Sequence, residues 1–250
     1  MAIEEEPRRR MERRTPVWEP PADVVALMGD VSGNELNGWD EPDVRQPTLV
    51  MWANPAKLAH GAVQVRMTEE FVAHPELQGV LRMNDRHEPA TIAVQKTERS
   101  PDDWVAALTA FAASPQGHHV ELVGVTQPRA EWFFEGRSSD LPWIVLLAVA
   151  MDHDQLATAP EHTSAIEVHR QYNRGTSAAR ALADWFRGQG FRADGHGGPG
   201  AGPIQMVPAA IEAGLGELGK HGSLINRELG SSFRLAAVLT DAPLRASAPD

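Results

Sequence analysis

Apolar and polar positions follow the clearest pattern in the second half of the chain, from residue 100 onward. Trp104, Leu108 and Phe111 recur at three- and four-residue spacing, which predicts a helix that Ser100 can cap. The nine apolar residues 143–151 are too few to span a membrane and predict a strand buried on both faces. Shorter apolar runs predict strands at 120–125, 191–193 and 233–240.

A longer amphipathic pattern predicts a helix over residues 163–187, which Gly190 terminates. Its apolar positions are Val168, Tyr172, Ala179, Leu182 and Phe186. Helices that alternate with hydrophobic strands indicate a layered α/β or α+β domain.

The first hundred residues carry weaker signals. Residues 1–45 are rich in Pro, Glu, Asp and Arg, and their lack of periodicity predicts an arm that is disordered or loosely docked. Residues 46–100 are interpreted as an N-terminal α/β segment. Its expected elements are strands at 48–52 and 91–94 and a short helix at 68–75.

Composition narrows the class of protein. The formal net charge of −11 argues against a nucleic acid as the main partner, because phosphate binding needs a basic surface. The 250 residues include no cysteine, which excludes disulfides and Cys-ligated clusters within them. No apolar run approaches the about 20 residues of a membrane span. The N-terminal arginines lack the apolar stretch of an export signal, so the sequence predicts a cytoplasmic protein without a membrane anchor.

The segment 206–222 is the most informative part of the sequence. Gly214, Gly216 and Gly219 interrupt what would otherwise be a helix, and Lys220 follows them directly. Glycine permits positive φ and a close approach to the backbone. Two interpretations stay open on these residues alone: a helix C-cap followed by a turn, or a loop that approaches a ligand.

Three consecutive stretches carry a resemblance: AGLGELGKHG at 213–222, LINRELG at 224–230 and FRLAAVLTDAPL at 233–244. Together with residues 120–125, 141–152 and 172–190 they resemble the cobalamin-binding domain of reductive dehalogenases, a pattern that epoxyqueuosine reductases share. The resemblance covers roughly residues 100–244. It implies an α+β fold, a nitroreductase-like α/β sandwich with a mixed sheet, for a domain over 101–250.

The resemblance also implies a cofactor and a set of site residues. The cofactor would be base-off cobalamin, bound without a protein histidine ligand. In the family a tyrosine with a neighbouring lysine or arginine protonates the carbon that loses halide, and Tyr172 and Lys220 are the candidates for this pair. The candidate cofactor-binding residues are Gly214, Leu215, Gly216, Gly219, His221, Gly222, Ser223 and Asn226, with the loop 195–202 as a further part of the cradle.

One departure from the family is large. Cysteine motifs for two 4Fe-4S clusters are expected after the last strand, and this chain has none up to Asp250. The resemblance therefore implies a corrin-binding part that removes halide from a small organohalide substrate and depends on an external electron donor or iron–sulfur partner. A non-catalytic cobalamin-binding module that needs a partner is the alternative. A tRNA-acting epoxyqueuosine reductase relative is disfavoured, because residues 202–208 contain no carboxylate.

Two other patterns are weaker. Residues 195–200 match the letters G-x-G-x-x-G, but Gly202 and Pro203 prevent a helix from starting at once, so a flexible loop is predicted rather than a dinucleotide site. The histidines of 118–119 and 152–154 are interpreted as solvated or capping residues, and no metal site is predicted.

Overall fold

The computed structural model of the 250-residue chain describes residues 87–159, 161–198 and 202–247. The predicted arm, the strand at 48–52 and the helix at 68–75 lie outside the described residues. The described elements, in chain order, are α5 (Pro101–Ala113), β1 (Leu122–Thr126), η2 (Ala130–Trp132), β2 (Trp143–Ala150), α6 (His153–Leu156), α7 (His162–Gly188), β3 (Ala193–Gly197), α8 (Met206–Glu212), β4 (Glu217–Leu218), β5 (Leu224–Ile225) and β6 (Phe233–Thr240).

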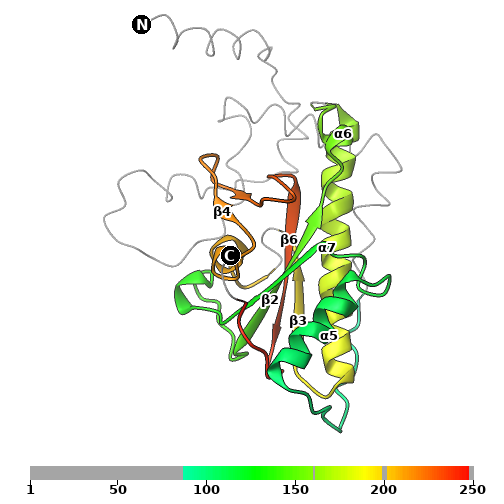
Figure 1. Cartoon of the computed structure of the whole chain (residues 1–250), viewed down its shortest axis with the longest axis vertical. Helices are drawn as coiled ribbons and strands as arrows, with labels where there is room; N and C mark the ends of the chain where they lie inside the picture. Colours follow the sequence, from blue (N-terminus) through cyan, green and yellow to red (C-terminus); the bar gives the residue numbers. More distant parts are fainter. Residues whose placement is uncertain (1–86, 160, 199–201, 248–250) are drawn as a thin grey trace, which may run out of the picture. The chain divides into compact units, whose positions relative to one another are not determined.

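A four-stranded sheet in the order β1-β2-β6-β3 organises these elements. Helices α5 and α7 cover one face of it, and α8 lies on the other (Figure 1). The predicted α+β class is confirmed. All the strand pairs within this sheet are antiparallel, whereas a mixed sheet was expected. β4 and β5 form a separate two-stranded hairpin.

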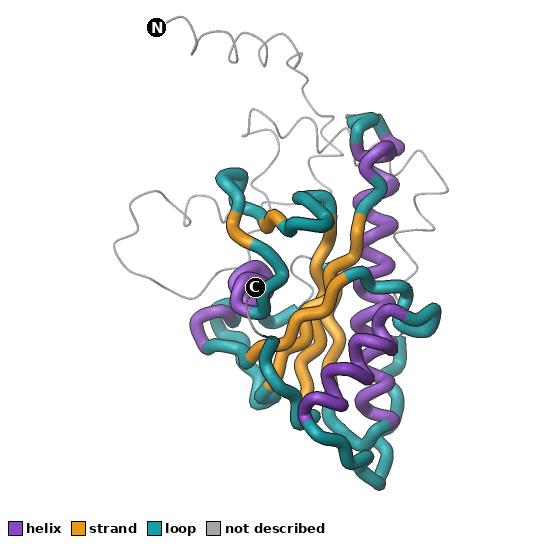
Figure 2. Tube along the Cα trace, viewed as in Figure 1, coloured by secondary structure: helices purple, strands orange, loops and turns teal. Residues whose placement is uncertain are grey.

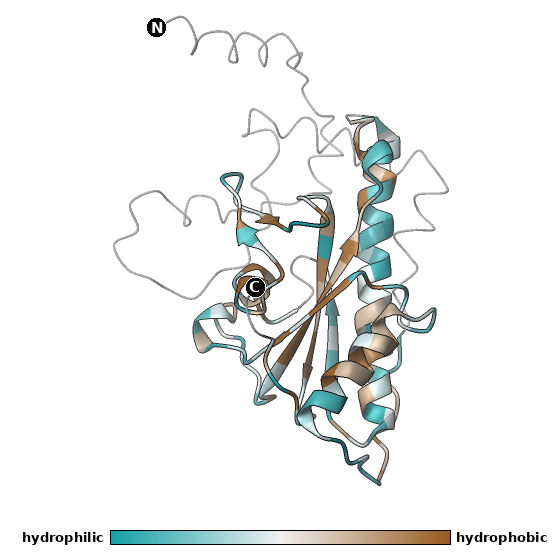
Figure 3. Cartoon of the chain, in the orientation of Figure 1, coloured by the Kyte–Doolittle hydropathy of each residue, from teal (hydrophilic) through white to brown (hydrophobic). Residues whose placement is uncertain are grey.

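Strand β2 is buried on both faces, as its apolar run predicts. Val145, Leu147 and Val149 pack in the cluster beneath α5 and α7, while the alternate residues Ile144 and Leu146 pack beneath α8. This follows from the two-residue repeat of a strand, which sends successive side chains to opposite faces. Figure 3 shows the resulting apolar colouring of the sheet, in contrast to the hydrophilic first half of α7.

The two predicted helices are confirmed at nearly their predicted bounds. α5 begins after Ser100, whose hydroxyl accepts a hydrogen bond from the backbone N–H of Asp103 at 3.2 Å. α7 ends at Gly188, and Gly190 follows in the left-handed region at φ 89°. The backbone amide of Gln189 closes the last turn of α7 on carbonyls of the helix, as a C-cap should.

Two predicted strands differ from the structure: one does not form, and the other begins and ends later than expected. Residues 91–94 form no strand: the N–H of Ala93 donates to the carbonyl of Arg187, at the end of α7, and Val94 is fully exposed. β3 begins at Ala193 and continues to Gly197, into the segment predicted as a loop.

Close packing against α7 explains the glycines of β3. A Cβ atom at Gly195 would lie 2.5 Å from the carbonyl oxygen of Ala179, and one at Gly197 would overlap Thr176. The glycines that looked like loop residues therefore let α7 rest directly on the strand. Within the described residues no helix is both long and apolar enough to cross a membrane.

Candidate functional site

Tyr172 lies on α7 with a cation against its ring. The guanidinium carbon of Arg234 is 4.6 Å from the centroid of the Tyr172 ring. Arg234 is the second residue of β6 and pairs with Val149 of β2, and its side chain points to the α7 face, like that of Ala236 two residues later. The fold thus brings together a helix residue and a strand residue that are far apart in the sequence.

His169 completes this group, which we call the Tyr172 cluster (His169, Tyr172 and Arg234). It lies one turn before Tyr172 on α7, and the two rings meet edge to face with centroids 6.1 Å apart. Burial, together with the nearby positive charge of Arg234, lowers the pKa of His169 below its ordinary value. The Nε of Arg234 is buried, and among the described residues it has no hydrogen-bond partner.

The first predicted glycine, Gly214, has a structural role. It follows α8 at φ 76°, its N–H donates to the carbonyl of Ile211, and the N–H of Leu215 donates to the carbonyl of Ala210. These two bonds form a Schellman motif, which ends helices with a left-handed glycine. The interpretation as a helix C-cap is confirmed for this residue.

The other predicted glycines belong to the β4–β5 hairpin. Gly216 has φ 151°, and a Cβ atom there would lie 2.5 Å from the carbonyl oxygen of Ile225, so the pairing of the hairpin requires glycine. Gly222 has φ 80° in the turn, with open space around it. Lys220 is exposed in the same turn. Figure 2 shows the hairpin beside the start of β6.

The polar side chains of the hairpin support its own backbone. The Nδ1 of His221 accepts a hydrogen bond from the N–H of Ser223 at 3.2 Å. The side-chain amide of Asn226 donates to the carbonyl of Leu215 at 3.0 Å, and its oxygen accepts from the N–H groups of Glu228 and Leu229. By contrast, the apolar side chains of Leu218 and Ile225 are 61% and 47% exposed.

The predicted loop 195–202 divides into a strand and a connection. Its first three residues belong to β3, and residues 199–201 lie outside the described residues. His196 is half-buried in β3 with its side chain against Gly202. Burial lowers the pKa of His196, and the negative charge of Asp194 partly opposes this.

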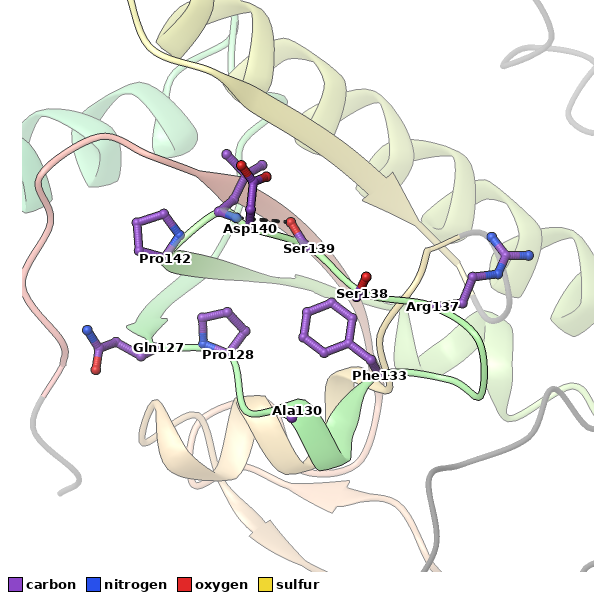
Figure 4. Close-up of a pocket in the computed structure, with 10 residues that line it drawn as sticks. Gln127, Pro128, Ala130, Phe133, Arg137, Ser138, Ser139, Asp140 and Pro142 are labelled. Carbon is purple, nitrogen blue, oxygen red and sulfur yellow. Dashed lines mark hydrogen bonds between the residues drawn. The ribbon is translucent and has the colours of Figure 1, made fainter.

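A separate cavity of about 450 Å³ lies in the connection between β1 and β2 (Figure 4). It contains none of the predicted site residues. Its lining residues are Gln127, Pro128, Ala130, Phe133, Arg137, Ser138, Ser139, Asp140, Leu141 and Pro142. In the described part of the chain, no group of three or more acidic or histidine side chains is placed to hold a metal ion.

Arg234 is the residue of the Tyr172 cluster whose place beside the phenol the sequence did not reveal. Its signal was present, because it is the single charged residue in the apolar run 233–240. A charge within a buried strand calls for a partner. The identity of that partner depends on how α7 lies across β6, which the sequence pattern does not contain.

The sequence is similar to those of reductive dehalogenases and, over a shorter stretch, of epoxyqueuosine reductases. The chain is 30% identical over 138 residues to the tetrachloroethene reductive dehalogenase of Dehalobacter restrictus, an alignment that covers 54% of this chain and 23% of the relative. The enzyme of the same name from Sulfurospirillum multivorans is 30% identical over 102 residues, covering 40% and 20%. Epoxyqueuosine reductase from Escherichia coli is 49% identical over 47 residues, covering 19% and 12%. No family model matches the sequence.

Solved structures give the same picture of the fold. A catabolic reductive dehalogenase in complex with 3-bromo-4-hydroxybenzoic acid superposes with a TM-score of 0.60 at 19% identity, covering 75% of this chain and 29% of that one. The reductive dehalogenase described with a mechanism for B12-dependent dehalogenation gives 0.56 at 20% identity, covering 76% and 27%. The predicted resemblance is confirmed, and the chain spans about a quarter of the length of the curated relatives that it matches first.

Proposed function

We propose that this chain forms the corrin-binding and proton-donating part of a cobalamin-dependent reductive dehalogenase. The observation that carries the proposal is the contact between Tyr172 and Arg234, in a chain related to tetrachloroethene reductive dehalogenases. The reaction replaces a carbon–halogen bond with a carbon–hydrogen bond. It consumes two electrons and one proton and releases halide.

Tyr172 is the proposed proton donor. After its phenol gives the proton to the carbon that loses halide, a phenolate remains, and a nearby cation favours that charged form. Arg234 supplies the cation, because a guanidinium stays protonated at any working pH and lies well against an aromatic face. The sequence pointed to Lys220 for this role. The contact of the Arg234 guanidinium with the Tyr172 ring supports Arg234 in this role, and Lys220 lies in the exposed turn of the hairpin.

The hairpin suits one edge of a corrin ring. Its exposed apolar residues Leu218 and Ile225 match the hydrocarbon of a large flat ligand. The glycine at 222 leaves room for close approach to the backbone, and Lys220 and Ser223 can meet amide side chains of the ring. When bound, cobalamin supplies the reducing cobalt centre. We propose the base-off form, bound without a protein histidine ligand, because the resemblance to the reductive dehalogenases implies it.

Electrons must come from outside these 250 residues, because they contain no cysteine to ligate a cluster. The proposed partners are a small organohalide and an iron–sulfur protein or module. A chemical reductant strong enough to reduce cobalt replaces that partner in a test. With a ferredoxin or flavodoxin alone, the isolated chain is expected to give no sustained turnover.

The test combines binding and turnover. Hydroxocobalamin titrated into the purified chain should change its absorbance spectrum at tens of micromolar or below, a weak-ligand range. With titanium citrate as reductant, Tyr172→Phe should bind cobalamin like the wild type and lose about 10²–10⁴-fold in dehalogenation rate. A spectrum that does not change removes the corrin site from the proposal. Binding without any turnover, in wild type and variant alike, favours the non-catalytic module.

A further inference from the structure

His169 adds a second ring to the proposed donor pair of Tyr172 and Arg234, and the sequence pattern assigns it no role. We propose that His169 is a positioning residue: as a neutral imidazole it holds the Tyr172 ring against Arg234. The inference rests on the proposed function, since it concerns the orientation of the proposed proton donor. It concerns a different residue, however, and has a separate physical readout.

The geometry places the Tyr172 ring between contacts from two elements. Arg234 of β6 lies over its face at 4.6 Å, and His169 of α7 meets it edge to face at 6.1 Å with an interplanar angle of 63°. Residues three apart on a helix are neighbours on its surface, so this pairing follows from the helix itself. Gly198 lies near the ring on the β3 side, where a Cβ atom would be 3.7 Å from Cδ1 of Tyr172.

The neutrality of His169 follows from its surroundings. Burial disfavours the imidazolium, and the charge of Arg234 disfavours it further, and both lower the pKa of His169. A protonated ring here would place a second positive charge next to the guanidinium. The repulsion would push Arg234 away from the phenol, so the cluster keeps its arrangement only while position 169 stays uncharged.

The neighbouring charged groups on the same helix are already engaged elsewhere. The fully buried carboxylate of Glu167 accepts from the N–H of Asp152 at 2.8 Å and from Arg170 at 3.0 Å. It ties the start of α7 to the end of β2. The charge of Glu167 is therefore committed to the junction of β2 and α7 and to Arg170.

Tyr172 is the single tyrosine of the chain, which makes a direct test possible. Tyrosine labelled with 13C at Cζ gives one NMR signal from the protein, and that signal reports the environment of the phenol without cofactor or substrate. His169→Phe keeps an uncharged ring of similar shape. His169→Lys introduces a charge at the same place, and His153→Lys, on the exposed helix α6, adds the same charge elsewhere and serves as the control.

We expect His169→Phe and His153→Lys to keep the wild-type 13C signal and a dehalogenation rate within about threefold of the wild type. His169→Lys should shift the signal and lower the rate by about tenfold or more, because a displaced acid loses part of the roughly 10²–10⁴-fold that general acid catalysis contributes. Equal losses in His169→Phe and His169→Lys, or no change in either signal, overturn the inference. If the signal responds as expected but no protein, wild type included, dehalogenates, the positioning role stands and the proposed function falls.

Discussion

The Tyr172 cluster and the β4–β5 hairpin are built on different principles. In the cluster, three side chains from α7 and β6 pack against one another, and their chemical identity is what matters. In the hairpin, positive φ angles and a close backbone contact at Gly216 fix the conformation, while Lys220 and the apolar tips face outward. A substitution in the cluster should therefore change chemistry and leave the fold intact. A substitution at a hairpin glycine should change local shape and, through it, ligand binding.

The strongest test of this contrast replaces each of the two candidate cations, Arg234 and Lys220, in turn. At saturating cobalamin, Arg234→Gln should lower the chemically driven rate by about 100-fold, because the phenolate loses its neighbouring charge. The rate of Arg234→Lys should lie between those of the wild type and Arg234→Gln, since an ammonium group keeps the charge but does not lie flat on the ring. Lys220→Ala should stay within about threefold of the wild type under the same conditions, below the loss typical of a general acid site. The reverse outcome would restore Lys220 as the partner of Tyr172.

A second test concerns the shape of the hairpin. Gly216→Ala places a methyl group against the carbonyl of Ile225 and should weaken cobalamin binding by about tenfold, equivalent to ~1.4 kcal/mol. Gly222→Ala places its methyl group in open space. Its expected cost is only that of a positive φ for a residue with a side chain, about 1–2 kcal/mol in the conformational energy of the turn. Absorbance titration measures the cobalamin affinity of both variants. Equal affinities for Gly216→Ala and the wild type would separate the hairpin from the corrin site.

The smallest expected effect is on stability at mild acid. Burial lowers the pKa of His169 and of His196 below the ordinary value of 6.5. At a pH between the folded and unfolded pKa values of these histidines, the unfolded chain binds more protons than the folded chain. The stability that the two neutral histidines contribute is therefore fully present above pH 6.5 and declines as the pH falls below it. We expect Tm to decrease as the pH falls from about 7 to 5, and to decrease less steeply in His169→Phe, which lacks one of these two histidines.

The sequence predicted the parts of the fold in which one physical signal dominates. The run 143–151 fits a strand buried on both sides, and the period of 163–187 fits a helix with an apolar stripe. It misplaced β3, because Gly195 and Gly197 look like loop residues when the helix that packs on them is unknown. It also took 91–94 for a strand on the strength of β-branched residues that lack a neighbouring strand.

The candidate site was predicted less well, for a related reason. Tyr172 was proposed because it is the single tyrosine of the chain and lies on an otherwise apolar helix face, and its role stays a prediction. Its neighbour was sought within a motif, on the glycine segment, whereas the contact in the structure joins a helix to a strand much later in the chain. Motifs record local conformation, as Gly214 and Gly216 do. They do not record which side chains two packed elements bring together.

The glycines of β3 affect the distance between Tyr172 and Arg234, although neither glycine belongs to the Tyr172 cluster. They serve as a spacer of minimal thickness between α7 and the sheet, since Ala179 and Thr176 rest directly on the strand backbone. A single methyl group at residue 195 would lift the helix away from the sheet. Tyr172 is part of α7 and would move with it, whereas Arg234 is part of β6. The distance between the phenol and the guanidinium would therefore increase. The spacing of the proposed donor pair thus depends in part on two residues that have no side chain.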